Sequence, residues 1–153
     1  MALRESEVER RVAAFVQALR AGGFRVTHQR LEVAREVARS EDHPDVEAVF
    51  NGVRRRVPTI SLDTVYRTVA ELERHGLVRR VSVTRGPARY DANTLRHHHF
   101  VCRKCGLIRD LYGEHLDDLE PPAEAVRLGR VEDVEVRFSG VCAECMRREE
   151  KGE

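Results

Sequence analysis

Two cysteine pairs of the form Cys-x-x-Cys constrain the fold of this chain more than any other feature. The first pair is Cys102 and Cys105, the second is Cys142 and Cys145, and 36 residues separate them. Each pair makes a tight turn that aims two sulfur atoms at one metal ion, and four thiolates around Zn²⁺ form a closed, redox-inert site. This pattern predicts a small β-rich module held together by zinc. The alternatives are a reversible disulfide and a thioredoxin-like dithiol, although the βαβ context of the latter is missing.

Charge and composition narrow the class of protein. Residues 1–95 carry 17 Lys and Arg against 13 Asp and Glu, whereas residues 96–153 carry 10 against 13, so the two parts have net charges of +4 and −3. A basic part joined to an acidic part indicates one module that faces a polyanion and a second module with another role. Only 5% of the residues are aromatic and none is Trp. Each module therefore has a small core, and the second one needs a metal or a partner chain.

The sequence contains no segment with the pattern of a membrane-spanning helix or a signal peptide. No apolar run approaches the roughly 20 residues that a membrane-spanning helix needs, and the N-terminal residues lack the apolar core of a signal peptide. We therefore expect a cytoplasmic protein without membrane contact. In that compartment thiols stay reduced, and paired cysteines more often bind metal or do redox chemistry than form structural bridges.

The first part of the chain has the periodicity of helices. Apolar residues recur at helical spacing in four segments, residues 10–21, 27–42, 44–56 and 61–75. Thr27 and Ser61 suit the N-cap position of the second and fourth segments, and Gly76 suits a helix stop.

A hairpin is expected directly after the fourth helix. Residues 77–84 and 88–91 are β-type runs joined by Arg85-Gly86-Pro87. Helices followed by a hairpin are the order of a winged helix-turn-helix, whose last helix enters the major groove of DNA. That helix should turn Leu62, Val65, Val69 and Leu72 inward and a polar face outward. The outward residues are Thr64, Arg67, Thr68, Glu71 and Arg74, with Tyr66 at the boundary. Such a face is usually just solvated, but the hairpin and the charge asymmetry favour DNA contact.

The pattern of the second part of the chain predicts short strands and helices around the two cysteine turns. Residues 100–102 and 107–112 are expected strands, and residues 114–128 are expected to be helical apart from Pro121-Pro122. Val134, Val136 and Phe138 alternate with charged residues, which is typical of a half-buried strand. Residues 143–153 should form a charged, frayed helix.

A second metal site is suggested by His97 and His99. Residues two apart on an extended strand point to the same face, and Asp91 and Asp110 lie nearby in the sequence. Imidazoles with carboxylates suit Fe²⁺, Mn²⁺, Ni²⁺ or Zn²⁺ rather than Ca²⁺. His98 should point the other way, as a surface residue or a residue that supports the ligands. A metal-dependent hydrolase is a remote alternative, because no H-E-x-x-H helix supplies a general base; we expect no enzyme.

Several motifs taken together resemble the ferric-uptake-regulator family of bacterial metal-responsive repressors, over nearly the whole chain. They are Thr27-His28-Gln29-Arg30, Ser61-Leu62-Asp63-Thr64-Val65-Tyr66-Arg67, Arg89-Tyr90-Asp91, and the run from His97 to Gly106 with the later cysteine pair. The resemblance implies an α+β fold with a winged-helix DNA-binding domain (residues 1–91), a hinge (92–95) and an α/β dimerisation and metal-binding domain (96–153). It further implies a V-shaped homodimer that binds an inverted-repeat operator in double-stranded DNA when loaded with metal.

The resemblance also assigns ligands and contacts residue by residue. Structural Zn²⁺ falls on Cys102, Cys105, Cys142 and Cys145. Regulatory Fe²⁺ or Mn²⁺ falls on His43, Asp91, His97, His99 and Asp110. The spacing of the residues would not identify His43 as a ligand, because by itself it has the position of a helix-cap residue before Pro44. For DNA we expect contacts from Tyr66 and Arg67, with Thr64 and Thr68 nearby, and a phosphate contact from Arg30.

The two Asp ligands resemble the peroxide-sensing branch of that family. In that branch bound Fe²⁺ reacts with H₂O₂ and a ligand histidine, here His43 or His97, is oxidised, so that the operator is released. The alternative is an iron- or manganese-responsive repressor without peroxide sensing. The chain departs from the family pattern at His28, usually Pro, and at Asp63, usually Ala, which adds a negative charge to the DNA face. An additional metal site of iron-sensing relatives is expected to be absent or degenerate, since its positions hold Arg96, His98 and Val134.

Overall fold

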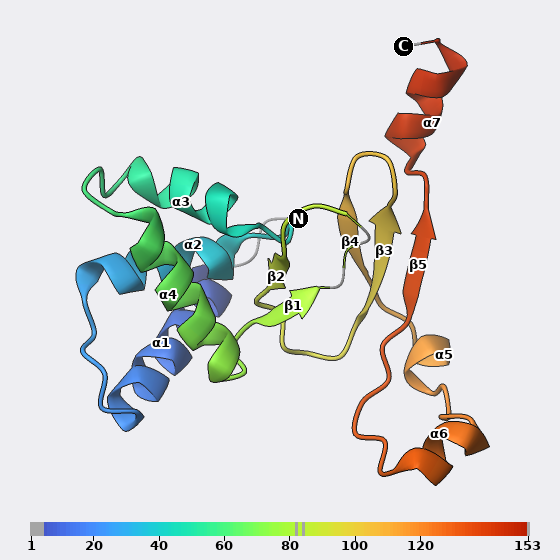
Figure 1. Cartoon of the computed structure of the whole chain (residues 1–153), viewed down its shortest axis with the longest axis horizontal. Coiled ribbons are helices and arrows are strands. Elements are labelled where there is room, and N and C mark those ends of the chain that lie inside the picture. Colours follow the sequence, from blue (N-terminus) through green and yellow to red (C-terminus); the bar gives the residue numbers. More distant parts are fainter. Residues whose placement is uncertain (1–4, 82, 84, 153) are drawn as a thin grey trace. The chain divides into compact units, whose positions relative to one another are not determined.

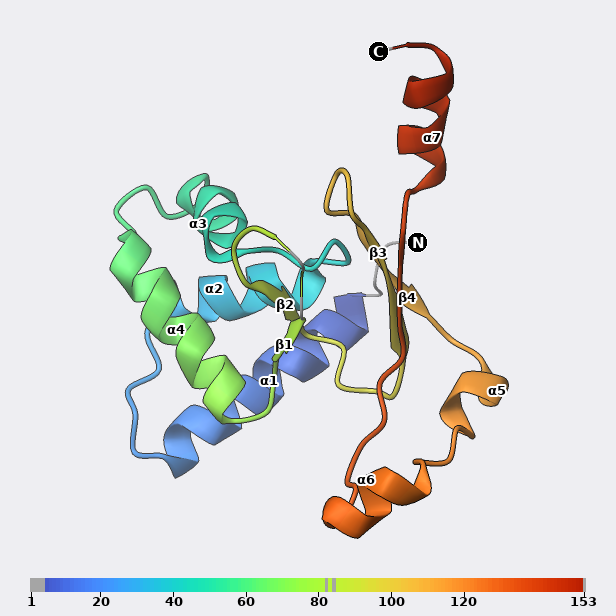
Figure 2. The same ribbon diagram turned by 45° about the vertical axis from the view of Figure 1, so that its right-hand side comes forward.

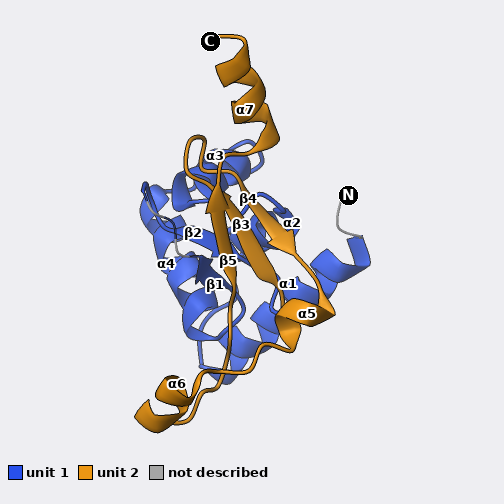
Figure 3. Cartoon of the chain, turned by 90° about the vertical axis from the view of Figure 1, so that its right-hand side faces the viewer, with its two compact units in different colours: residues 1–94 blue, residues 95–153 orange. Residues whose placement is uncertain are grey.

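The structure is a computed structural model that describes residues 5–81, 83 and 85–152. It divides into two compact units, Met1–Thr94 and Leu95–Glu153, which are coloured separately in Figure 3. Within the described residues, unit 1 contains helices and a two-stranded sheet, and unit 2 contains a three-stranded sheet and short helices. The fold is the predicted α+β class.

Unit 1 begins with four helices, and side chains cap three of them. They are α1 (Glu5–Ala21), α2 (His28–Arg39), α3 (Val46–Arg54) and α4 (Leu62–Arg74) (Figure 1). The side chains of Thr27 and Ser61 accept hydrogen bonds from the amides of Arg30 and Thr64, as N-caps do. The third helix was expected to start at Pro44. It starts at Val46 instead, because the Asp45 carboxylate accepts from the Ala48 amide at 2.8 Å and so takes the cap position.

The core of unit 1 lies where α2 meets the other three helices. Helix α2 contacts α1, α3 and α4 (Figure 1). Apolar side chains from all four helices pack together in one buried cluster. The fully buried members include Phe15, Leu19, Val33, Val37, Val49, Val53, Val65 and Val69. Burial of each such side chain contributes roughly 1.5–3 kcal/mol to stability. Leu62 was expected to face inward, but it is 38% exposed because it occupies the first turn of α4, beyond the edge of this core.

A buried acid joins α2 to the end of α3. Glu32 is only 7% exposed, and its carboxylate accepts from the guanidinium groups of Arg56 and Arg35, each at 2.7 Å. The hydrogen bond from Arg56 is the main reason that the pKa of Glu32 lies below its ordinary value. Arg56 also donates to Glu36. A buried charge is tolerated when it is paired in this way, so Arg56 fastens the C-terminal end of α3 to α2.

A two-stranded antiparallel sheet completes unit 1. Strands β1 (Arg79–Val81) and β2 (Arg89–Asp91) pair in the register Arg79↔Asp91. This is the hairpin that the sequence predicts, with shorter strands than expected. Of the expected first strand, Ser82 and Thr84 lie outside the described residues. Four helices followed by this hairpin have the element order of a winged helix.

Unit 2 is organised by a three-stranded sheet in the order β4-β3-β5. Strand β3 (His98–Cys102) pairs antiparallel with β4 (Ile108–Leu111) and parallel with β5 (Arg137–Gly140). A parallel pair needs a long crossover, and the chain makes it through two short helices that follow β4 (Figure 2). These are α5 (Glu114–Asp117) and α6 (Ala123–Leu128). Helix α7 (Ala143–Glu150) follows β5.

The last strand starts later than the alternation of apolar residues suggests. A strand was expected over residues 134–138, but β5 begins at Arg137. The reason is that the Val136 amide donates to the His98 ring and not to a backbone carbonyl of β3, although the Val136 carbonyl still accepts from the His99 amide. Phe138 is 47% exposed.

None of the helices found in the described parts of the chain is long and apolar enough to cross a membrane.

Candidate metal centres

The pairing of β3 with β5 brings the two cysteine turns together. Cys102 ends β3, and its register partner on β5 is Gly140, two residues before Cys142. Cys142 is also the residue that precedes the first turn of α7, in which Cys145 lies. The amide of Arg103 donates to the Gly140 carbonyl at 2.8 Å, which extends the pairing into the turn. The strand register therefore brings together, at one end of the sheet, two cysteine pairs that have 36 residues between them in the sequence.

The four sulfur atoms have the spacing of a tetrahedral metal site. All four lie within 4.8 Å of one another. Two of the separations are 4.0 Å, between Cys102 and Cys145, and 3.7 Å, between Cys105 and Cys142. Four sulfurs placed about 2.3 Å from a central Zn²⁺ lie roughly 3.8 Å apart. A disulfide would require about 2.05 Å, so the arrangement fits the predicted zinc rather than the disulfide alternative.

The thiols differ in their readiness to ionise. Burial raises the pKa of Cys102, but the amides of Cys105, Cys142 and Lys104 point at its sulfur and outweigh burial, which brings the pKa to about 6. The Cys142 amide lies 3.3 Å from this sulfur. Burial and the three neighbouring cysteines raise the pKa of Cys145 to about 12. Several thiolates can coexist this close only when a cation balances their charge, which is the condition that Zn²⁺ meets.

Unit 2 also brings together two histidines and an aspartate. His97 precedes β3, His99 lies on β3, and Asp110 is the register partner of His99 on β4. The two Nε2 atoms are 3.0 Å apart, and an Asp110 oxygen lies 3.6 Å from that of His97 and 3.7 Å from that of His99. The prediction that His97 and His99 share a face is confirmed, and Asp110 joins them through the β3–β4 register.

The other ring nitrogens orient these two imidazoles. The Nδ1 atom of His97 lies 2.7 Å from the Leu95 carbonyl, and that of His99 lies 2.8 Å from a Glu135 carboxylate oxygen. An oxygen acceptor fixes the proton on Nδ1, so both Nε2 lone pairs face the same point. Metal-binding histidines are commonly held in this way. The three side chains thus fit a divalent metal that accepts imidazole and carboxylate ligands.

Glu135 is a participant that sequence reasoning missed. The alternating pattern of residues 134–138 placed it among solvent-facing charges, and its side chain is indeed half exposed. Its contact with His99 depends on the register between β3 and the segment that enters β5. The only signal in the sequence would have been a carboxylate beside a strand that leads to the second cysteine pair.

His98 lies on the opposite face of β3 and is fully buried. Its Nδ1 atom accepts from the Val136 amide at 3.0 Å, so Nε2 carries the proton and donates to Asp117 at 3.2 Å. His98 does point away from His97 and His99, but of its two expected roles the surface residue is wrong, because the side chain is fully buried. His98 instead ties β3 to α5 and to the segment before β5, and so supports the strand that carries His99.

Unit 1 contains the other two predicted regulatory ligands. His43 lies in the loop between α2 and α3, and Asp91 ends β2. The His43 Nε2 atom is 3.8 Å from the Asp91 Oδ2 atom. The other carboxylate oxygen of Asp91 accepts from the Asn93 amide at 2.7 Å, which orients the side chain. The five predicted ligands therefore fall into two groups, a pair within unit 1 and a triad within unit 2.

The outer face of α4 differs from the prediction at one residue. Tyr66 is 52% exposed, and Arg67 and Asp63 are also exposed. Arg67 pairs with Asp63 one turn earlier at 3.0 Å. Thr68 was expected to lie near DNA, but it is buried and its hydroxyl donates to the Thr64 carbonyl. The helical repeat turns Thr68 toward the core beside Val65 and Val69, and its satisfied hydroxyl makes that burial tolerable.

Arg30 and Thr64, the remaining predicted DNA contacts, are partly exposed. The Arg30 guanidinium donates to the Arg25 carbonyl at 2.8 Å. Thr64 follows the N-cap of α4, and its hydroxyl lies 2.9 Å from that of Ser61. Their roles stay predictions.

Comparison with known proteins gives consistent matches. The sequence model of the Ferric uptake regulator family (FUR) matches residues 21–138. The peroxide-responsive repressor PerR of Staphylococcus epidermidis is 29% identical over 145 residues, covering 95% of this chain and 97% of the relative. The solved structure of the Campylobacter jejuni peroxide stress regulator is 30% identical with a TM-score of 0.64, covering 85% of this chain and 98% of that one. The fold is also that of the Helicobacter pylori ferric uptake regulator Fur, at 21% identity and a TM-score of 0.78, covering 95% and 97% of the two chains.

Proposed function

Because this chain belongs to the ferric uptake regulator family, we propose that it is a transcriptional repressor whose affinity for operator DNA depends on a regulatory metal. The observation that carries this proposal is the division of the ligands: His43 and Asp91 belong to the unit with the winged helix, and His97, His99 and Asp110 belong to the other. A single ion bound by both groups would restrict the motion of one unit against the other. We propose a regulator and not an enzyme.

The regulatory metal would be Fe²⁺ or Mn²⁺, one per chain. Three imidazoles and two carboxylates form the mixed nitrogen and oxygen set that these ions accept. A metal favours the DNA-binding geometry only if it binds that geometry more tightly than the alternatives. A coupling free energy of about 1–3 kcal/mol corresponds to roughly 5- to 150-fold tighter operator binding.

The four cysteines would hold one Zn²⁺ per chain in a structural role. The sulfur separations of 3.7 and 4.0 Å support this assignment. All four cysteines are used by that site, so the regulatory metal takes its ligands from histidine and aspartate alone.

The chain would act in the cytoplasm, as a homodimer that binds an inverted-repeat operator in double-stranded DNA. Unit 2 supports this because it exposes large apolar side chains, including Leu128, which is 92% exposed. The others among the described residues of unit 2 are Leu95, Tyr112, Leu119, Val126, Val131, Phe138 and Met146. Exposed apolar groups of this extent mark association surfaces, and two winged helices related by a dyad match the symmetry of an inverted repeat.

Helix α4 would lie in the major groove, with Tyr66 and Arg67 at the bases and Thr64 beside them, while Arg30 would contact phosphate. Asp63 opposes this role, because its carboxylate adds negative charge to the face and holds the Arg67 guanidinium at 3.0 Å. Operator binding must therefore break or reorient that ion pair.

Replacing Asp63 by Ala is expected to tighten operator binding. The variant removes a charge that phosphates repel and releases Arg67 for DNA, so a gain of about 3- to 10-fold at low salt is expected, of the order of one added charge contact. Fluorescence anisotropy with the operator at several salt concentrations measures it.

The control for Asp63→Ala is Glu73→Ala, which removes the same charge from α4 but from the residue that pairs with Arg80. It should leave operator affinity within about twofold. The assignment of Arg67 is tested separately: an Arg67→Ala protein that keeps full operator affinity refutes it, since a base contact is worth about 1–3 kcal/mol.

The signal would be peroxide. The two aspartates at positions 91 and 110 support this reading, as does the similarity to PerR of Staphylococcus epidermidis and to the Campylobacter jejuni peroxide stress regulator. Fe²⁺ held by these ligands would supply the redox chemistry that cleaves the O–O bond of H₂O₂. His43 or His97 would gain one oxygen atom in place of an imidazole C–H hydrogen, and the other oxygen atom would leave with that hydrogen as water, so that H₂O₂ is the oxidant. An oxidised imidazole is a poorer ligand, so the metal and then the operator would be lost.

Brief exposure of the Fe²⁺-loaded protein to H₂O₂ is expected to add the mass of one oxygen atom to a His43 or His97 peptide. Imidazoles that hold the metal would be oxidised because the reaction takes place beside them. His28 is exposed and lies outside both ligand groups, so it should stay unchanged. Peptide mass spectrometry measures both positions in the same digest.

The Mn²⁺-loaded protein is the control for this experiment and should show no added oxygen at either histidine. If the Fe²⁺ protein also stays unmodified while chelation still releases it from the operator, the chain is an iron- or manganese-responsive repressor without peroxide sensing.

A further inference from the structure

The loop that carries His43 has an unusual backbone. It runs from Ser40, after α2, to Asp45, the N-cap of α3. His43 has φ = 51°, and among the described residues it is the only one besides glycines with positive φ. The next residue is Pro44, which restricts the conformation of the residue before it. A residue other than glycine keeps this left-handed backbone conformation only where the surrounding structure holds it there.

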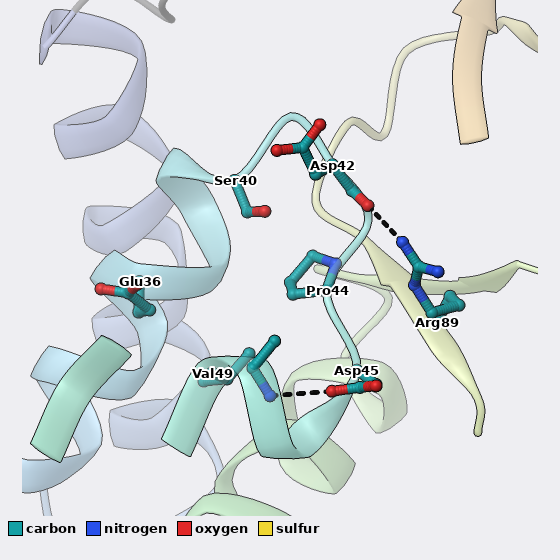
Figure 4. A pocket seen from close by; sticks show the side chains of 8 residues that line it. Glu36, Ser40, Asp42, Pro44, Asp45, Val49 and Arg89 are labelled. Carbon is teal, nitrogen blue, oxygen red and sulfur yellow. Dashed lines mark hydrogen bonds between the residues drawn. The ribbon is translucent and has the colours of Figure 1, made fainter. Parts of the chain in front are cut away.

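Hydrogen bonds from β2 hold the backbone of His43 in this conformation. The Arg89 guanidinium donates through Nε to the His43 carbonyl. Through Nη2 it donates to the Asp42 carbonyl at 2.6 Å, which is the bond drawn in Figure 4. The Tyr90 amide donates to the Pro44 carbonyl at 3.0 Å. Three consecutive carbonyls of the loop are therefore held by two consecutive residues of β2. A planar guanidinium is suited to this, because its donors lie in a fixed fork.

The His43 side chain is buried, at 3% exposure, but another side of the loop is not packed against the core, so there the hydrogen bonds from β2 constrain it. A pocket of about 370 Å³ borders the loop, and its lining includes Asp42, Pro44 and Arg89 (Figure 4). Its other polar walls are Glu36, Ser40 and Asp45. Side chains that face such a space do not press the loop into one conformation as a packed core would.

The same strand also carries the neighbour of His43. Asp91 lies two residues after Arg89, on the same face of β2. Its Oδ2 atom is 3.8 Å from the His43 Nε2 atom. Arg89 thus sets the backbone of one proposed ligand while β2 directly presents another.

From this geometry we propose that Arg89 is a positioning residue for the regulatory metal: it holds the backbone of His43 in the left-handed conformation that places the imidazole beside Asp91. The proposal rests on the proposed function, in which His43 is a ligand. Arg89 does not touch the metal. Its removal lets residues 42–44 relax into ordinary backbone conformations and moves the imidazole away from Asp91.

The test is Mn²⁺ affinity of the zinc-loaded full-length protein, measured by the electron paramagnetic resonance signal of free Mn²⁺. Arg89→Ala is expected to weaken Mn²⁺ binding about 10- to 100-fold, the range found for residues that orient metal ligands. Arg89→Lys keeps the charge and most of the stem but can hold only one carbonyl well, so a smaller loss is expected. It also serves if Arg89→Ala fails to fold. The matched control is Arg85→Ala, which removes a guanidinium from the exposed turn between β1 and β2 and should change affinity less than about twofold.

Two further readouts separate positioning from a general effect on stability. In a double-mutant cycle, Arg89→Ala should have no further effect on Mn²⁺ affinity once His43 is replaced by Ala, because it acts through that side chain. In the metal-free protein, hydrogen exchange at the Tyr90 amide should accelerate in Arg89→Ala, because its Pro44 acceptor is no longer held.

The outcomes distinguish the positioning role of Arg89 from the assignment of His43 as a metal ligand. If His43→Ala weakens Mn²⁺ binding but Arg89→Ala does not, or if the two effects simply add, the inference is overturned and the ligand assignment stands. If His43→Ala binds Mn²⁺ as tightly as the unaltered chain, the ligand assignment itself fails, and the inference fails with it.

Discussion

Replacement of Cys142 by Ser is expected to remove the zinc and, with it, the fold of unit 2. Cys142 couples the two halves of the site, since its sulfur lies 3.7 Å from that of Cys105 and its amide points at the sulfur of Cys102. Zinc binding in small structural sites is worth about 10–16 kcal/mol near neutral pH. That is as much as the total stability of a typical domain, about 5–15 kcal/mol, so no other contact in this small unit can replace it.

The consequences should reach DNA binding. Without a folded unit 2 the chain loses its proposed association surface, and a monomer contacts half of an inverted repeat, so a loss of operator affinity on the order of 100-fold or more is expected. Four measurements follow these effects in order. Zinc content per chain reports the metal, and hydrogen exchange of the β3 and β5 amides reports the fold of unit 2. Sedimentation velocity reports association, and operator titration reports DNA binding.

Arg103→Ala is the matched control for Cys142→Ser. Arg103 lies inside the first cysteine turn and is exposed, and its structural contact is made by its backbone amide, so the variant should keep one zinc per chain. A Cys142→Ser protein with one tightly held zinc and native exchange rates in unit 2 would contradict the assignment.

Replacement of His97 by Ala is expected to abolish the response of operator binding to Mn²⁺ while leaving the zinc in place. The substitution removes one of two imidazoles whose Nε2 atoms are 3.0 Å apart. Loss of orienting groups alone weakens metal sites about 10- to 100-fold, so loss of a ligand should weaken Mn²⁺ binding on the order of 100-fold or more. The roughly 5- to 150-fold gain in operator affinity that a coupled metal provides should then disappear.

Operator titrations with and without Mn²⁺ measure this effect, and His115→Ala is the control. His115 belongs to the same unit, is exposed on α5 and lies outside both ligand groups. Its replacement should leave the response to Mn²⁺ unchanged. An undiminished response in His97→Ala would exclude His97 from the regulatory site.

Local patterns accounted for most of the secondary structure. The helical periodicity of unit 1 predicted its four helices, and the N-cap roles of Thr27 and Ser61 are confirmed. These features depend on residues within one or two turns of each other. The errors arose where a distant contact overrides the local pattern: Val136 leaves the expected strand because its amide bonds to the His98 ring.

The candidate sites divide in the same way. The chemistry of the cysteine pairs and of His97 and His99 could be read from spacing, because a tight turn or one strand face brings those residues together. His43 could be assigned as a ligand only through the resemblance to a family, because no motif near it in the sequence indicates a metal site. Neither route found Glu135 beside His99, nor Arg89 beside the loop that carries His43.

The sequence by itself determined which elements form and which side chains can bind a metal, because helix periodicity, caps and Cys-x-x-Cys turns are short-range properties of the chain. Only the tertiary structure decided which of these groups meet. Strand register joins Cys102 to the turn of Cys142, and the β3–β4 register joins His99 to Asp110. A register is selected by the packing of whole strands and not by any one residue, so it could not be read from the positions of the ligands alone.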